Sequence, residues 1–242
     1  MPSKERSQTK TVETRRWFDR ASESADFELR IAGGYHGYLR RLGKIAAGLS
    51  GPAILEVGAG AGRFSVELKE RGFEIVATDI SPDLLRILGK RDSRIPCVLA
   101  DAHNLPFRDK VFDAVFSCDV LEHLVNPQRT IQEQARICKK QGTILAIVPN
   151  RLCPFYLRNF LRERYWWRFG TPPFLLRPSL KGLAANFRNA GLQLRRLDTF
   201  GAVPVGASGG LFRFLRRIET SLERIPPIRV IVGLIYVQAE NR

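Results

Sequence analysis

The stretch of residues 54–63, Ile-Leu-Glu-Val-Gly-Ala-Gly-Ala-Gly-Arg, constrains the fold more than any other part of the sequence. The apolar run over residues 53–55 predicts a short buried strand, and the apolar spacing over residues 64–71 predicts a helix. Between them lie three glycines at alternate positions, Gly58, Gly60 and Gly62. Glycine adopts positive φ readily, and its missing side chain lets the backbone approach a ligand. A strand, a glycine turn and a helix in this order predict the first unit of a nucleotide-binding βαβ fold.

The spacing of these glycines indicates which class of nucleotide the turn would bind. A dinucleotide fingerprint, G-x-G-x-x-G, needs a glycine at the sixth position counted from Gly58, and that position is Arg63. The pattern is instead E-x-G-x-G-x-G, starting at Glu56. A dehydrogenase is therefore disfavoured. From the glycine turn alone, a tight strand-to-helix connection without a ligand stays open.

Later apolar runs follow the same plan. The second run, residues 73–79, ends in Asp79, which lies 21 residues after the first glycine of the turn. This is close to the offset at which a carboxylate accepts hydrogen bonds from both ribose hydroxyls in such folds. A third run covers residues 97–102 and a fourth covers residues 112–118. Strands that alternate with helices predict a largely parallel sheet, with ligands outside the carboxyl ends of its strands.

Five short motifs together resemble a known family. They are E-x-G-x-G-x-G from Glu56, D-A at 101–102, L-P-F at 105–107, F-D-x-V at 112–115 and L-E-H-L at 121–124. Over roughly residues 50–150, their order resembles the small-molecule, type 11-like branch of the class I S-adenosylmethionine-dependent methyltransferases. The resemblance implies an α/β fold, a Rossmann-like doubly wound seven-stranded sheet that is mostly parallel with an antiparallel last strand and helices on both faces. It also implies S-adenosyl-L-methionine as cofactor and S-adenosyl-L-homocysteine as product. No metal is expected, because the three histidines, at 36, 103 and 123, are too scattered in the sequence to predict a metal site.

The resemblance also implies roles for individual residues. Asp101 would accept a hydrogen bond from the adenine amino group, and the backbone of Ala102 would contact a ring nitrogen. Glu56 and Cys118 would lie near the methionine half of the cofactor. Asp113, by contrast, is expected to make a structural pair near the start of its strand. The complete set of expected cofactor-binding residues is Glu56, Gly58, Ala59, Gly60, Gly62, Asp79, Ile80, Asp101, Ala102 and Cys118.

The expected reaction is an in-line displacement, in which an acceptor oxygen, nitrogen or carbon attacks the sulfonium methyl group; oxygen is the favoured atom. A hydroxyl acceptor must also lose its proton. His123 is the predicted base, because it follows the fourth strand and a histidine has a reference pKa of ~6.5. Glu122 and His36 are weaker candidates. The alternative for His123 is that it closes the cofactor pocket or caps a turn.

The remaining sequence is arranged around a cofactor-binding core at residues 51–150. Tyr156, Trp166 and Trp167 are the expected substrate contacts, because they lie in a segment rich in aromatic and arginine residues. The other predicted regions are an N-terminal tail with cap helices over 1–50, an aromatic and basic lid over 151–177, and the end of the core sheet over 178–242 with an amphipathic insert at 201–228. Further helices are predicted over 11–50, 126–140, 178–190 and 211–225, and further strands over 143–148, 192–197 and 229–238.

Positive charge gathers in the second half of the chain. Residues 151–242 hold 16 Lys or Arg against 5 Asp or Glu, a net +11 of the chain's +15. A basic amphipathic helix beside an aromatic insert suits an anionic membrane surface and a lipid-linked acceptor. The same residues could bind RNA, although no RNA-binding module is recognisable, so a nucleic acid partner is disfavoured. The remaining alternative is a lid of solvated arginines over apolar residues.

Cysteine and hydropathy patterns bear on the compartment. The four cysteines, at 97, 118, 138 and 153, form no C-x-x-C pair and are expected to be buried free thiols. Arg15-Arg16 resembles a twin-arginine signal, but a charged segment follows in place of an apolar one. We expect a cytoplasmic protein, peripheral to the inner face of the membrane if the basic segments contact lipid. Alternatives to a small-molecule methyltransferase are an RNA or protein methyltransferase and a non-catalytic methyltransferase-like domain.

Overall fold

The structure is a computed structural model of the 242-residue chain. It describes residues 34–150, 152–153, 179–201 and 233–242, together with residues 12, 15, 16, 221 and 225; the side chains of residues 34–38 are not included. The predicted substrate contacts Tyr156, Trp166 and Trp167 and the predicted helix over 211–225 lie outside this described part, apart from residues 221 and 225. The same holds for most of the predicted helical region before residue 34.

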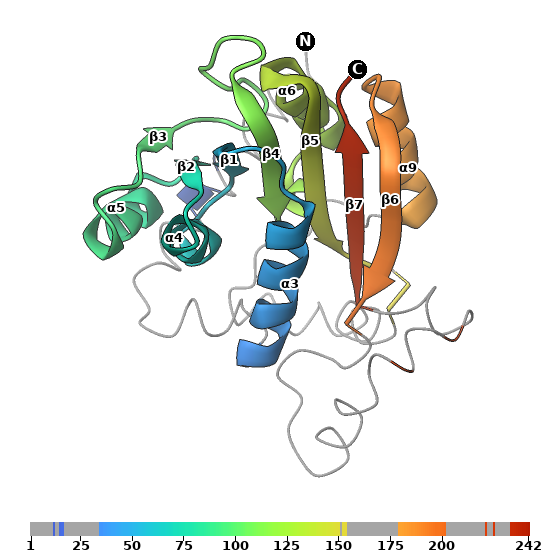
Figure 1. Ribbon diagram of the computed structural model, residues 1–242, viewed down its shortest axis with the longest axis horizontal. Helices are drawn as coiled ribbons and strands as arrows, with labels where there is room; N and C mark the ends of the chain where they lie inside the picture. The colour runs from blue at the N-terminus through green and yellow to red at the C-terminus, as the bar shows by residue number, and fades with distance from the viewer. Residues whose placement is uncertain are drawn as a thin grey trace.

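A seven-stranded sheet forms the centre of the molecule, in the order β3-β2-β1-β4-β5-β7-β6 (Figure 1). The pairs β1–β2, β1–β4, β2–β3 and β4–β5 are parallel, and β7 runs antiparallel to both β5 and β6. This confirms the predicted mostly parallel sheet with an antiparallel last strand. The strands are β1 (Ala53–Val57), β2 (Glu74–Asp79), β3 (Cys97–Leu99), β4 (Phe112–Cys118), β5 (Cys138–Pro149), β6 (Gln193–Phe200) and β7 (Leu234–Glu240).

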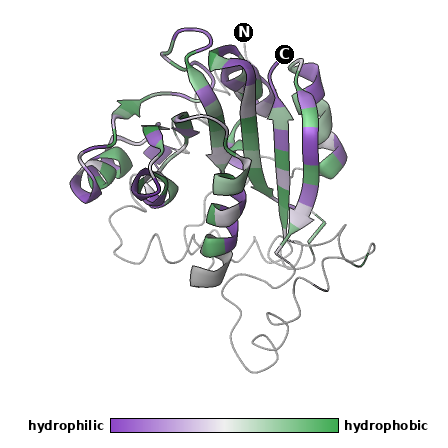
Figure 2. Cartoon of the chain, in the orientation of Figure 1, coloured by the Kyte–Doolittle hydropathy of each residue, from purple (hydrophilic) through white to green (hydrophobic). Residues whose placement is uncertain are grey.

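Helices cover both faces of the sheet. Apolar residues of α3, α4 and α5 share one buried cluster with one face, and those of α6 and α9 share a second cluster with the other (Figure 1). Successive residues of β5 point to opposite clusters, Leu145 to the first and Ala146 to the second. A strand that is covered on both sides reads as a continuous apolar run, and Figure 2 shows the central strands β4 and β5 as largely hydrophobic. The helices are α3 (Gly34–Gly48), α4 (Arg63–Glu70), α5 (Pro82–Arg91), α6 (Pro127–Ile137) and α9 (Leu180–Asn189), and η1 (Leu121–His123) is a short 3-10 helix.

The predicted helix starts are confirmed by their capping contacts. The Ser81 hydroxyl accepts a hydrogen bond from the amide of Leu84 at the start of α5, and Pro82 follows as the first helical residue. At the start of α6, the Asn126 side chain accepts from the amide of Arg129. Each cap satisfies one backbone donor that the first helical turn leaves without an internal partner.

The boundary between α6 and β5 differs from the prediction. The helix ends at Ile137, not at residue 140, and β5 begins at Cys138, not at residue 143. Cys138 is fully buried and pairs with Phe112 of β4, so the strand starts where the chain re-enters the core. The polar residues 139–141 resemble a last helical turn in sequence, but they lie exposed on the strand.

Two further predictions need correction. Strand β6 extends to Phe200, past the predicted end at residue 197, because Thr199 and Phe200 pair with Ile235 and Leu234 of β7. Cys97 is exposed, whereas the other three cysteines are buried as predicted, and all four are free thiols. The reason is that β3 is a three-residue strand at the edge of the sheet, where few elements cover it. Within the described residues, no helix has the length and apolar character required to cross a membrane.

Candidate functional site

A cavity opens at the carboxyl ends of the parallel strands β1, β2 and β4, and the segment that follows β3 forms part of its wall. It encloses about 1140 Å³ of non-protein space, part of it open to solvent. This edge of a parallel sheet is where ligands of α/β folds bind. The predicted site residues that line the cavity are Glu56, Gly58, Ala59, Gly60, Asp79, Ile80, Asp101, Ala102, Cys118 and His123.

The glycine turn forms one wall of the cavity. The amides of Gly58 and Ala59 both donate to the Thr78 carbonyl oxygen, at 2.8 and 2.9 Å, which ties the turn to the end of β2. Gly58 and Gly60 have φ of 73° and 56°, a region that other residues enter at a cost. A Cβ on Gly58 would lie 2.4 Å from the Val120 side chain, whereas a Cβ on Gly60 would meet nothing within 4 Å. Gly58 is thus required by packing, and Gly60 borders open space.

Gly62 is placed differently from the other two glycines of the turn. It does not line the cavity. Its φ is 81°, and a Cβ there would lie 2.1 Å from the Leu88 side chain of α5. As the residue before α4, it lets that helix and α5 pack closely.

Asp79 ends β2 at the cavity wall, and two backbone amides orient its carboxylate. Its Oδ2 accepts from the Gly60 amide at 2.8 Å, and its Oδ1 accepts from the Ser81 amide at 2.9 Å. The carboxylate therefore links the glycine turn to the start of α5. A carboxylate held in this plane can accept hydrogen bonds from two neighbouring hydroxyl groups.

Glu56 is a carboxyl group almost removed from solvent, 2% exposed, at the end of β1. The Ser65 hydroxyl of α4 donates a hydrogen bond to it. Burial raises the pKa of Glu56 to about 8, against the lowering effects of Ser65 and the nearby Arg63. Glu56 therefore holds its proton at neutral pH, and a cationic ligand group beside it would favour the ionised form.

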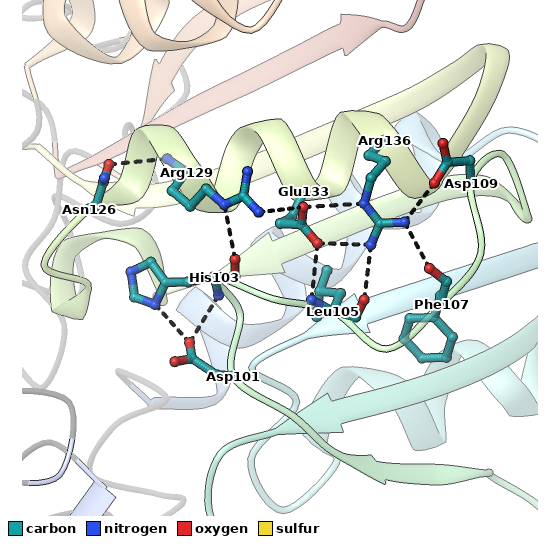
Figure 3. Close-up of polar contacts among 9 residues, drawn as sticks. All are labelled: Asp101, His103, Leu105, Phe107, Asp109, Asn126, Arg129, Glu133 and Arg136. Atoms are coloured by element: carbon teal, nitrogen blue, oxygen red, sulfur yellow. Dashed lines mark hydrogen bonds and ion pairs between the residues drawn. The ribbon is translucent and has the colours of Figure 1, made fainter. Parts of the chain in front are cut away.

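The opposite wall carries Asp101 and Ala102, which follow β3. Asp101 Oδ1 accepts from the His103 amide at 2.9 Å and lies 2.7 Å from His103 Nδ1 (Figure 3). The hydrogen bond from the His103 side chain lowers the pKa of Asp101, so this carboxyl stays ionised. An ionised carboxylate accepts hydrogen bonds and donates none, as a partner for an amino group must.

The carboxyl end of β4 supplies the third side of the cavity. Cys118 is buried, and burial raises the pKa of its thiol well above the ordinary value, so it is not a nucleophile. Asp119 follows with a φ of 57°, a strained conformation for a residue with a side chain. Its Oδ2 lies 3.2 Å from the Arg41 Nη2 of α3. This ion pair joins the N-terminal helix to the site.

The 3-10 helix η1 carries the two candidate bases. His123 is 8% exposed and lines the cavity, and its Nε2 lies 4.0 Å from Glu122 Oε1. Glu122 is 1% exposed and does not line the cavity. Burial, together with the negative charge of Asp119, raises the pKa of Glu122 well above its ordinary value, which favours the protonated form. Of these two, only His123 is placed to contact a ligand; the side chain of His36 lies outside the described part.

Sequence reasoning missed two charged residues at the cavity. Arg63, at the start of α4, lines it, although the sequence used this position only to exclude a dinucleotide fingerprint. A cation directly after a glycine turn could have indicated an anionic ligand group. Asp119 also lines it, and the signal was an acid directly after a buried strand. Asp113 pairs structurally as predicted, because it accepts from the Ala53 amide at 3.0 Å and contacts Lys139 at 2.6 Å.

The described residues contain no group of three or more His, Cys, Asp or Glu side chains that could hold a metal ion.

Comparisons with known proteins bear on this site. Residues 55–146 match the family model described as a methyltransferase domain. The chain is 36% identical over 105 residues to the demethylmenaquinone methyltransferase of Clavibacter sepedonicus, which is 42% of this chain and 43% of that protein. It is 35% identical over 166 residues to an uncharacterised protein of Methanocaldococcus jannaschii, which is 68% of this chain and 71% of that protein.

The fold also matches solved structures. A methyltransferase of Thermotoga maritima, described as S-adenosylmethionine-dependent and as a possible histamine N-methyltransferase, superposes with a TM-score of 0.72. The match covers 95% of this chain and 100% of that one at 18% identity, so it is evidence for the fold alone. The chain spans less than half of the length of the first curated relatives that it matches.

Proposed function

We propose that this chain, which belongs to the class I S-adenosylmethionine-dependent methyltransferases, transfers the methyl group of S-adenosyl-L-methionine to a small-molecule or lipid-linked acceptor. The observation that carries the proposal is one cavity that brings together the glycine turn, Asp79 and Asp101 at the carboxyl ends of neighbouring strands. Its wall offers a carboxylate for each of two donor groups, the ribose hydroxyls and the adenine amine. It also offers open space beside Gly60 for the ligand itself.

The residues of the cavity fit the cofactor along its length. Asp79 would accept from the ribose hydroxyls, and the glycine turn would lie against the sugar. Asp101 would accept from the adenine amino group, and the backbone of Ala102 would contact the ring. Glu56 and Arg63 would serve the methionine end, where an ammonium and a carboxylate need partners of opposite charge. A cationic amino group beside Glu56 lowers the pKa of that carboxyl from its raised value near 8.

When bound, the cofactor supplies a sulfonium methyl group that is already activated for displacement. The chain then has to align the acceptor, and positioning of two reactants can lower a barrier by roughly 7–11 kcal/mol. For a hydroxyl acceptor, His123 takes the proton at an imidazole nitrogen; a well-placed base contributes typically ~10²–10⁴-fold. His123 is the candidate because it lines the cavity, whereas Glu122 is buried and does not line it. O-methylation is therefore the reaction that we propose.

Two observations support a small-molecule or lipid-linked acceptor. The relatives named demethylmenaquinone methyltransferases share the cofactor-binding half of this chain, and by their name they act on a quinone. Residues 151–242 carry 16 Lys or Arg against 5 Asp or Glu, and 15 of the 16 are arginine. Arginine suits phosphate and carboxylate groups of a substrate, or an anionic membrane surface beside a lipid-linked one. We propose a cytoplasmic protein with peripheral membrane contact.

The test is to incubate the purified chain with methyl-labelled S-adenosyl-L-methionine and whole-cell extract, and to follow the label. Label in the organic phase supports a lipid-linked acceptor, and label in small water-soluble molecules supports a soluble one. Label in RNA or protein contradicts the proposed acceptor class. Tight cofactor binding without transfer to any fraction contradicts catalysis and favours a binding domain.

A further inference from the structure

The loop between β3 and β4 carries part of the cavity wall. Its first residues, Asp101, Ala102 and His103, line the cavity. Asp101 and His103 contact each other, and the Asn104 amide donates to the Asp101 carbonyl oxygen at 2.9 Å. These contacts shape the tip of the loop but do not fix its position relative to the sheet.

Contacts from α6 hold the next part of the loop. The Leu105 amide donates to Glu133 Oε2 at 3.1 Å, and Arg136 Nη2 donates to the Leu105 carbonyl oxygen at 2.9 Å (Figure 3). Arg136 Nη1 donates to the Phe107 carbonyl oxygen at 2.8 Å and contacts Asp109 Oδ1 at 2.7 Å. Both backbone groups of Leu105 thus bind to a charged pair on one helix.

The two residues of this charged pair, Glu133 and Arg136, also contact each other. Arg136 contacts Glu133 through two nitrogens, Nη2 to Oε2 at 2.8 Å and Nε to Oε1 at 3.2 Å. Arg129, four residues before Glu133 on the same face of α6, contacts Glu133 Oε1 at 3.2 Å and donates to the His103 carbonyl oxygen at 3.2 Å. The Glu133 side chain is 4% exposed. Three residues on one stripe of α6 therefore contact three successive odd-numbered backbone positions of the loop.

From this geometry we propose that Glu133 and Arg136 are positioning residues for the end of the cavity that receives adenine. Neither lines the cavity; they act through the loop that holds Asp101 and Ala102 in place. This inference rests on the proposed function, which assigns that end to adenine. Two-nitrogen contacts between a guanidinium and a carboxylate fix orientation as well as distance, as a positioning role requires.

The inference predicts a selective defect. If methionine replaces Arg136, the Leu105 and Phe107 carbonyl oxygens lose the donors of its guanidinium, and Glu133 keeps only the Arg129 guanidinium as a charged partner. The loop then shifts or opens, and Asp101 no longer meets the adenine amino group at a fixed distance. Binding of the ribose and methionine parts depends instead on Asp79, at the end of β2, and on the glycine turn, which is tied to the Thr78 carbonyl oxygen.

The experiment measures two ligands by titration calorimetry, S-adenosyl-L-homocysteine and S-inosyl-L-homocysteine. The second has a carbonyl oxygen where adenine has its amino group, so a carboxylate that needs a donor rejects it. Wild type is expected to prefer the adenine ligand by roughly tenfold or more, the size of one charge-assisted hydrogen bond. Arg136→Met should weaken the affinity for S-adenosyl-L-homocysteine by about the same factor and change the affinity for S-inosyl-L-homocysteine little. The preference for the adenine ligand is then lost. Arg136→Lys keeps the positive charge but loses the planar guanidinium with its several donors, so its preference for the adenine ligand should lie between those of wild type and Arg136→Met.

The matched control is Arg195→Met, which removes an arginine that pairs with Glu240 far from the loop, on β6 and β7. It should leave both affinities unchanged. If wild type does not bind S-adenosyl-L-homocysteine, the proposed function fails. If wild type binds it with the expected preference but folded Arg136→Met keeps that preference, or loses both ligands equally, the positioning role is overturned. Circular dichroism at the titration temperature checks folding, and if Arg136→Met does not fold, Arg136→Lys decides by the same criterion.

Discussion

Replacement of Glu56 by glutamine should stabilise the protein by an amount that grows with pH. Glu56 is 2% exposed, and burial raises its pKa from 4.5 to about 8. In the unfolded chain the carboxyl ionises near pH 4.5, whereas in the folded chain it keeps its proton until about pH 8. Between these values the folded state binds one proton more than the unfolded state, so the free energy of unfolding falls as pH rises.

The magnitude follows from the two pKa values. Each pH unit in this window costs about 1.4 kcal/mol. From pH 4.5 to pH 7 the wild-type protein therefore loses about 3 kcal/mol of stability through Glu56, relative to a variant that cannot ionise there. Glutamine has nearly the same shape and can still accept a hydrogen bond from Ser65. Its own effect on packing is constant with pH and does not contribute to this difference.

Urea unfolding of wild type and Glu56→Gln at pH 4.5, 5.5, 6.5 and 7.5, without cofactor, measures the difference directly. The unfolding free energy of Glu56→Gln, relative to that of wild type, should rise steadily with pH across this range. The pKa of Glu122 is also raised, so Glu122 contributes its own pH dependence to the unfolding free energy. That contribution is present in both proteins and cancels in the difference between them. A difference in unfolding free energy that stays flat with pH would refute the reasoning, because Glu56 would then ionise alike in both states. A carboxyl that costs stability at neutral pH is consistent with retention for ligand binding.

Four further substitutions have distinct expected outcomes. His123→Ala should lower turnover by about 10²-fold or more with unchanged cofactor affinity, because a base acts on the reaction and not on cofactor binding. Near-normal turnover of this variant would contradict the role of His123 as base. Gly62→Ala should lower the unfolding free energy by about 1–3 kcal/mol, because a positive φ of 81° is combined with a 2.1 Å clash with Leu88. Gly60→Ala, which has a positive φ but no clash, should cost less stability and should weaken cofactor binding; equal effects of the two on stability would contradict this. Arg41→Met should destabilise by about 3 kcal/mol in urea unfolding, because it leaves Asp119 without its ion-pair partner at a strained position.

Much of the core was predictable because its signals are local. The strand, glycine turn and helix around residues 54–71 follow from apolar spacing and glycine positions, and the caps at Ser81 and Asn126 follow from residue type alone. The offset of Asp79 from the turn placed it at the cavity because chain length between parallel strands is constrained by the intervening helix.

What escaped prediction depends on contacts between distant segments. The start of β5 at Cys138 is fixed by pairing with Phe112, which sequence spacing does not reveal. The need for glycine at position 62 comes from close packing against Leu88 of a later helix, which the sequence does not reveal. Arg136 looks like an ordinary helical arginine in sequence, and only its contacts with the loop give it a role.

The measurement that tests the central claim most directly is calorimetric titration of wild type and Asp79→Asn with S-adenosyl-L-homocysteine and with NAD. We predict one S-adenosyl-L-homocysteine per chain for wild type, an affinity at least about tenfold weaker for Asp79→Asn, and no binding of NAD. Binding of NAD in preference, no binding of S-adenosyl-L-homocysteine, or an Asp79→Asn variant with wild-type affinity would contradict the account.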